Sequence, residues 1–205
     1  MILPVFPLGT PLLPYQLLPL HVFEERYRTL TRQCLAGDRR FGVVLIERGR
    51  EVADAEGRRD DIPFDVGAVA QVVDAAELPD GRFVLQTVGR ERFRVERWLP
   101  DDPYPRAEVE ILVEEPGDDP ATPLAEVATR LERVHALRSE LGETIADHEF
   151  DADPVLASWE ASLLAGLGAL DLYRLLTARD ATERLTLLAS LLDDAEAVLL
   201  MQLGL

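Results

Sequence analysis

The sequence has 205 residues, of which 47% are hydrophobic and 29% are charged. This composition is typical of a globular protein with one domain or two closely packed lobes. A chain of this length buries enough surface to fold without disulfides or a structural metal. The formal net charge is −17, and all 21 basic residues are arginines. Because so acidic a field repels a phosphate backbone, nucleic acid is not expected as a partner.

The first ten residues and the cysteine content bear on the cellular compartment. MILPVFPLGT lacks the positive start and the unbroken apolar run of a secretory signal. No apolar run approaches the ~20 residues that a membrane span requires. The single cysteine, Cys34, has no intrachain partner for a disulfide. We therefore expect a cytoplasmic protein that does not interact with membranes.

The first 115 residues read as short strands separated by Gly, Pro and Asp. The Pro79-Asp80-Gly81 segment predicts a hairpin turn, because glycine accepts a positive φ without a steric clash. Phe23, Tyr27, Leu30 and Cys34 recur at helical spacing and predict one early helix that ends near Gly37. The expected strands are Ile2–Phe6, Leu17–Leu20, Phe41–Arg48, Val66–Asp74, Arg82–Val88, Arg92–Leu99 and Ala107–Val113.

The pattern changes to leucine-rich helices after about residue 122. Thr122 is a candidate N-cap followed by Pro123, and Gly142 marks the helix end. Asp153-Pro154 repeats the start signal, and Asp180 with Glu183 has capping-box spacing. We therefore expect an α+β protein with a strongly bent or barrel-like sheet and at least three bundled helices. The expected domains are a β-rich lobe at 1–115, an acidic Pro/Gly connection at 116–121 and a helical bundle at 122–205.

The sequence argues against catalysis by its composition. A P-loop and a serine–lysine peptidase dyad both need a lysine, and the chain has none. His21, His135 and His148 are far apart, and no CxxC motif is present. Cys34 falls on the apolar face of its helix, where burial makes a thiol unreactive. No catalytic, metal-binding or cofactor-binding residues are therefore predicted.

An ordered series of motifs along nearly the whole chain resembles the N-terminal substrate-recognition domain of Lon proteases. Its start is the pair of segments Leu3-Pro4-Val5-Phe6-Pro7-Leu8 and Pro19-Leu20-His21-Val22-Phe23-Glu24-Glu25-Arg26-Tyr27. Later blocks that look similar to the family are Phe41-Gly42-Val43-Val44, Val66-Gly67-Ala68-Val69-Ala70, Asp80-Gly81-Arg82, Val88 to Val95, Pro103 to Val109, Asp153-Pro154 and Arg184-Leu185.

The resemblance implies a PUA-like pseudo-β-barrel in the first lobe and a helical bundle in the second. It also implies a stand-alone recognition module without the ATPase and peptidase modules of full-length Lon. The leading hypothesis is thus a non-enzymatic module that binds exposed apolar protein segments or one protein partner, and that delivers clients to a protease. The alternatives are a small-molecule receptor or regulator with its site between barrel and bundle, an enzyme with an unrecognised site, and a self-assembling homo-oligomer.

Most residues inside these motifs have a structural explanation. The glycines suit turns or close approaches, the prolines suit bends, and the aromatic side chains suit the core. We assign these roles to Pro7, Pro19, Phe23, Tyr27, Gly42, Gly67, Gly89 and Phe93.

The candidate partner-binding residues lie in a proline-rich apolar loop and at two motif arginines. Leu12, Leu13, Tyr15 and Leu17 would form an apolar patch suited to unfolded segments, unless the loop tucks against its own sheet. Arg26 and Arg92 either hold a buried carbonyl or carboxylate, or present their guanidinium groups to a ligand.

Overall fold

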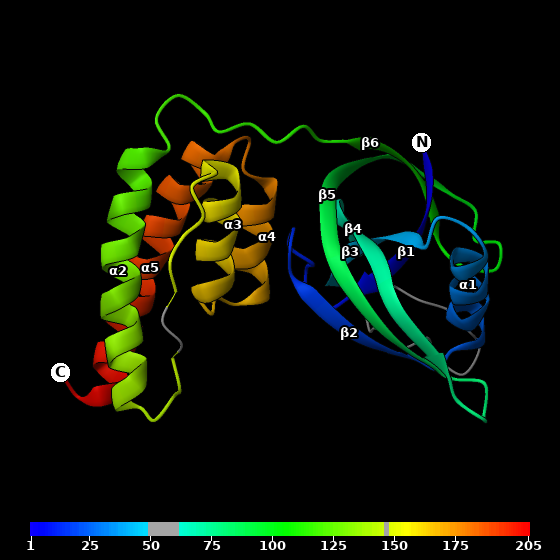
Figure 1. Ribbon diagram of the computed structural model, residues 1–205, viewed down its shortest axis with the longest axis horizontal. Helices are drawn as coiled ribbons and strands as arrows, with labels where there is room; N and C mark the ends of the chain where they lie inside the picture. Colours follow the sequence, from blue (N-terminus) through cyan, green and yellow to red (C-terminus); the bar gives the residue numbers. More distant parts are fainter. Residues whose placement is uncertain (49–61, 146–147) are drawn as a thin grey trace. The chain divides into compact units, whose positions relative to one another are not determined.

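A computed structural model describes residues 1–48, 62–145 and 148–205, and these residues form one sheet of six strands and five helices. The chain divides into two compact units, Met1–Val113 and Glu114–Leu205. The sheet and helix α1 lie in the first unit, called the sheet unit, and the other helices lie in the second, called the helical unit (Figure 1). The predicted α+β class is confirmed.

The strands of the sheet unit pair in the order β2-β5-β4-β3-β1-β6, and β6 also pairs with β5. Strands β1, β3, β4, β5 and β6 therefore form a closed ring, to which β2 adds by pairing with β5. Among the described residues, β2 has no second strand partner. The strands are β1 (Ile2–Leu8), β2 (Leu17–Val22), β3 (Arg40–Arg48), β4 (Ile62–Glu77), β5 (Phe83–Leu99) and β6 (Arg106–Ile111).

Strand β5 corrects one prediction, because it joins the two segments expected to be separate strands around Gly89. Its first half pairs with β2 and its second half with β6, while β4 follows it along both halves. Gly89 lies inside this continuous strand. A glycine is required at this position because the backbone of Leu13 occupies the space that a side chain would fill. A Cβ there would lie 2.0 Å from the carbonyl oxygen of Leu13. The predicted turn is confirmed: Gly81 has φ +79° and donates its N–H to the Leu78 carbonyl at 2.8 Å.

Helix α1 (Glu25–Ala36) packs its apolar face into the core of the sheet unit, as the spacing of Tyr27, Leu30 and Cys34 predicts. The Tyr27 ring stacks on Phe6 with 4.0 Å between centroids. The prediction for Phe23 was wrong. Phe23 precedes the helix and is 53% exposed, because the chain is still extended at Glu24 when it enters α1.

The helical unit contains α2 (Ala121–Glu140), α3 (Pro154–Leu164), α4 (Ala169–Thr177) and α5 (Ala181–Leu203). Leucine, valine and alanine side chains from these helices form one continuous buried cluster. The Trp159 side chain is also fully buried. Over the described ranges, none of the helices combines the length and the apolar character needed to cross a membrane.

Two of the three predicted helix starts are confirmed. Asp153 caps α3 by accepting the N–H groups of Val155 and Leu156, and Asp180 caps α5 by accepting the Glu183 N–H at 2.8 Å. The Thr122 cap was wrong, because α2 begins at Ala121 and Thr122 lies inside its first turn. Its N–H donates to the Asp119 carboxylate, and the hydrogen bonds from Thr122 lower the pKa of Asp119.

Candidate functional site

Strand β2 and the residues that flank it present a row of exposed side chains, which we call the β2 face and define as Tyr15, Leu17, Pro19, His21 and Phe23. Alternate residues of a strand point to opposite sides. The intervening Leu20 and Val22 are accordingly buried in the core, while Leu17 is 68% exposed. Three large apolar side chains, those of Tyr15, Leu17 and Phe23, are thus about half exposed or more in one short segment. Such grouping is uncommon unless the surface binds something.

A shallow cavity of about 210 Å³ lies beside the end of β2. Pro19, His21 and Phe23 of the β2 face line it, and so do Phe6 and Tyr27 of the core. Its other lining residues are Leu8, Leu20, Val22 and Glu24. An apolar hollow next to an exposed row of apolar side chains can accept a hydrophobic side chain from a bound segment.

The loop before β2 is held to β5 by hydrogen bonds that leave Tyr15 at the surface. The Tyr15 N–H donates to the Gly89 carbonyl at 2.9 Å, and the Gly89 N–H donates to the Gln16 carbonyl at 2.8 Å. The Gln16 side chain accepts the Leu13 N–H at 2.9 Å. Tyr15 itself has φ +65°, a left-handed conformation that is uncommon outside glycine, and its side chain is 49% exposed. This geometry fixes the start of the β2 face.

The predicted patch is divided between core and surface. Leu12 and Leu13 are 1% and 0% exposed, so this half of the loop tucks against the sheet. Tyr15 and Leu17 lie on the β2 face. The sequence-based patch left out Pro19, His21 and Phe23, because apolar residues occupy both sides of this segment and do not show which side is buried.

Neither candidate arginine belongs to the exposed row. Arg92 is buried, and its carbonyl accepts the Leu112 N–H at 2.9 Å. The Arg26 side chain is largely buried, with Nε 3.1 Å from a Glu24 carboxylate oxygen and the guanidinium 4.8 Å from the Tyr27 ring centroid. These contacts place Arg26 where it can support the wall of the cavity that Glu24 and Tyr27 line.

The motif glycines allow close packing in the sheet unit. A Cβ on Gly42 or on Gly67 would lie 2.7 Å from the fully buried Phe93 ring. The prediction that Pro7 and Pro19 form bends was wrong, because both lie within strands. Pro19 is on an edge strand. Among the described residues, Pro7 pairs with β3 alone, because β6 pairs with β1 only as far as Pro4. A missing N–H is tolerated at such positions.

The described residues provide little for metal or thiol chemistry. Within those ranges, no three histidine, cysteine, aspartate or glutamate side chains are placed to hold a metal ion. Burial, reinforced by the charge of Asp38, raises the pKa of the Cys34 thiol to about 12. The thiol donates to the Arg40 carbonyl at 3.2 Å.

We expect Cys34 to resist thiol reagents in the native protein, because the reactive species is the thiolate. An Ellman assay at pH 8 should therefore show no reaction until urea is added. The raised pKa also predicts that the contribution of Cys34 to stability is constant below about pH 9 and falls as the pH rises toward 12, since only the unfolded chain then ionises its thiol freely. A Cys34→Ala variant should lose this part of the alkaline dependence. Rapid labelling of the native protein at pH 8 would contradict the assignment.

Comparisons with known proteins agree on one family. A model of the ATP-dependent protease La (LON) substrate-binding domain matches residues 2–194. The Lon protease of Cytophaga hutchinsonii is 29% identical over 201 residues, which are 94% of this chain and 24% of that protein. Lon protease 2 of Herpetosiphon aurantiacus is 28% identical over 203 residues, or 96% of this chain and 24% of that protein. The chain thus spans about a quarter of the length of these relatives.

Solved structures show the same relationship. The crystal structure of a Lon N-terminal domain protein from Xanthomonas campestris has a TM-score of 0.68 and 28% identity, with 93% of this chain and 98% of that chain covered. The N-terminal domain of the Mycobacterium avium complex Lon protease has a TM-score of 0.63 at 17% identity, covering 95% and 99%, and supports the fold alone. The chain therefore belongs to the family of ATP-dependent protease La (LON) substrate-binding domains.

Proposed function

We propose that this chain is a non-catalytic recognition module that binds extended apolar segments of protein substrates on its β2 face. The observation that carries the proposal is the exposed row of Tyr15, Leu17 and Phe23 beside an apolar cavity. The family's description as a substrate-binding domain supports this assignment. We also propose that the chain delivers the bound client to a protease. For the fold, we propose that the ring of strands is a PUA-like pseudo-barrel and that the helices form a bundle.

An extended client segment would lie along the free edge of β2. Edge strands present unpaired main-chain groups, and peptides add to them by backbone hydrogen bonds while side chains enter nearby pockets. Pro19 offers no N–H, so pairing would use the main chain of Leu17 and His21 on either side. In this arrangement the buried Leu12 and Leu13 side chains hold the loop before β2 against the sheet, and Arg26 supports the cavity wall. Arg92 is buried and does not contact the client.

Charge plays a smaller part than apolar contact in this proposal. The acidic residues divide equally between the two units, but 15 of the 21 arginines lie in the sheet unit. The helical unit therefore carries most of the net negative charge, whereas the unit with the β2 face is nearly balanced. Binding at this face should accordingly depend only weakly on salt concentration.

Serine substitutions at Leu17 and Phe23 should weaken binding of a fluorescently labelled, unstructured peptide that carries leucine and phenylalanine at alternate positions. We expect a loss of about tenfold for each substitution, because each removes an apolar side chain from the contact. Fluorescence anisotropy measures the dissociation constants. Both side chains are exposed in the free protein, so the fold should be preserved.

A Leu170→Ser variant provides the matched control, because Leu170 is 65% exposed but lies on α4 of the helical unit. Its affinity for the peptide should equal that of the unsubstituted protein. Equal losses in all three variants would contradict a specific β2 face, and no binding by the unsubstituted protein would contradict the proposed function.

A further inference from the structure

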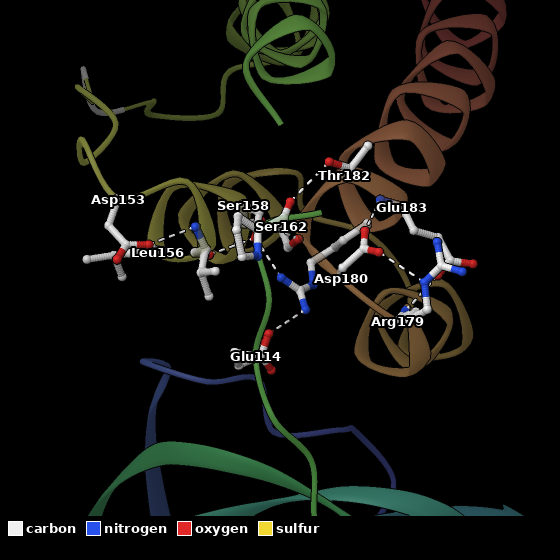
Figure 2. Close-up of polar contacts among 12 residues, drawn as sticks. Glu114, Asp153, Leu156, Ser158, Ser162, Arg179, Asp180, Thr182 and Glu183 are labelled. Carbon is white, nitrogen blue, oxygen red and sulfur yellow. Dashed lines mark hydrogen bonds and ion pairs between the residues drawn. The ribbon is translucent and has the colours of Figure 1, made fainter. Parts of the chain in front are cut away.

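Arg184 lies fully buried in the helical unit and uses its guanidinium group to hold the segment that leaves the sheet unit. The group stacks on the Trp159 ring at 3.4 Å from the centroid. Nη1 donates to Ser158 Oγ at 2.6 Å, and Nη2 donates to Glu114 Oε2 at 2.9 Å (Figure 2). A buried arginine is stable only when its donors are paired. The charge of Arg184 therefore ties Glu114 to α3 and α5.

The three residues after Glu114 contact the start of α5. The first N–H groups of a helix have no partner within the helix. Here the Ala181 N–H donates to the Glu115 carbonyl at 2.9 Å, and the Thr182 N–H and hydroxyl donate to the Pro116 carbonyl at 3.1 and 3.0 Å. Gly117 has φ +79°, and a Cβ there would lie 2.5 Å from Thr182 Oγ1. The connecting segment thus serves as a cap of α5.

Upstream, the chain remains attached to the sheet unit as far as Leu112. Ile111 pairs with Phe93, and the Leu112 N–H donates to the Arg92 carbonyl at 2.9 Å. Only Val113, which is 75% exposed, lies between this attachment and the bond of Glu114 to Arg184.

We infer that residues 114–117 form a fixed anchor on the helical unit and that Val113 is the pivot between the two units. Changes in their relative orientation then depend on the backbone dihedrals of Val113 and of the bonds that flank it. Hinges of this kind are a few positions that absorb the φ/ψ change. The β-branched side chain of valine narrows the conformations open to the pivot.

Amide hydrogen exchange of the full chain, followed by NMR, tests the anchor. The Ala181 and Thr182 amides should exchange more slowly than the Ala169 and Leu170 amides at the start of α4, whose N-cap Gly168 makes no side-chain cap bond. Glu114→Gln and Arg184→Met should each accelerate exchange at Ala181 and Thr182 by about tenfold, because the charge-assisted bond is lost. Exchange at Ala181 and Thr182 as fast as at Ala169 in the unsubstituted protein would overturn the anchor.

Distances between spin labels on the two units test the pivot. Labels at Asp74→Cys and Ser139→Cys lie on exposed positions of β4 and α2, and the buried native Cys34 should stay unlabelled. Val113→Gly should widen the distance distribution without changing exchange at Ala181 and Thr182. Glu114→Gln should change both measurements. If Val113→Gly leaves the distribution of label distances unaltered, Val113 is not the pivot. This test does not depend on whether Arg184→Met folds.

Discussion

Replacing Gly89 with alanine should destabilise the protein by about 3 kcal/mol and should also abolish peptide binding at the β2 face. The added Cβ would lie 2.0 Å from the Leu13 carbonyl oxygen and 2.9 Å from its carbon. Neither neighbour is a flexible side-chain end, so the loop must move away from β5. That movement breaks the bond from the Tyr15 N–H to Gly89 and disorders the start of the β2 face.

Urea denaturation followed by circular dichroism measures the loss of stability, and the anisotropy assay measures binding. Gly168→Ala is the control, because a Cβ at Gly168 meets nothing within 4 Å. Its cost should be about 1 kcal/mol, the typical cost of an alanine at an N-cap. Equal stability of the Gly89→Ala and Gly168→Ala variants would show that the close approach of Leu13 is not required.

Truncation of Arg184 to alanine should cost about 3 kcal/mol of unfolding free energy. The change leaves a cavity over the Trp159 ring. It also removes the guanidinium N–H groups that donate to Ser158 and Glu114. Arg184→Met should cost less, because its aliphatic chain still packs on the ring. Glu114 is partly exposed, so water can reach its carboxylate when the bond to Arg184 is lost, and this limits the penalty on that side.

Arg174→Ala is the matched control for this series. Arg174 is 54% exposed and pairs with Asp171 at 3.1 Å along α4, and exposed pairs of this kind contribute less than about 1 kcal/mol. If Arg184→Ala and Arg174→Ala melt at the same temperature, the buried cluster does not stabilise the helical unit.

Local patterns predicted the elements that local chemistry determines. Asp153 before Pro154 and Asp180 before Glu183 identify two helix starts, because a capping carboxylate acts within three residues of itself. The prediction for Phe23 also used a local pattern, but it failed. Phe23 stands one helical turn before Tyr27, yet α1 begins two residues after Phe23. Spacing alone does not show where a helix begins.

Contacts between distant segments were beyond prediction from the pattern. Gly89 suggests a break in a strand until Leu13, far away in sequence, is seen to need the space. The Arg184 and Glu114 side chains meet across 70 positions, and no local signal links them. Helix α4 was not predicted individually because its N-cap, Gly168, makes no side-chain bond that the sequence would reveal.

The binding face was half predicted for a related reason. Apolar residues occupy both sides of β2, since Leu17 and Pro19 alternate with Leu18 and Leu20. Composition therefore identified an apolar segment, but it did not show which side is buried. Pairing of β2 with β5 decides this, because it buries Leu20 and Val22 and leaves Leu17 and Phe23 exposed.

The proposal that the β2 face recognises protein segments is tested most directly by NMR titration of the full chain with the unstructured peptide. We expect saturable amide shifts at Tyr15, Leu17, His21 and Phe23 and at the cavity residues Leu8 and Tyr27, with little change in α2 to α5. Shifts confined to the helical unit, or none at peptide concentrations that saturate the anisotropy assay, would contradict it.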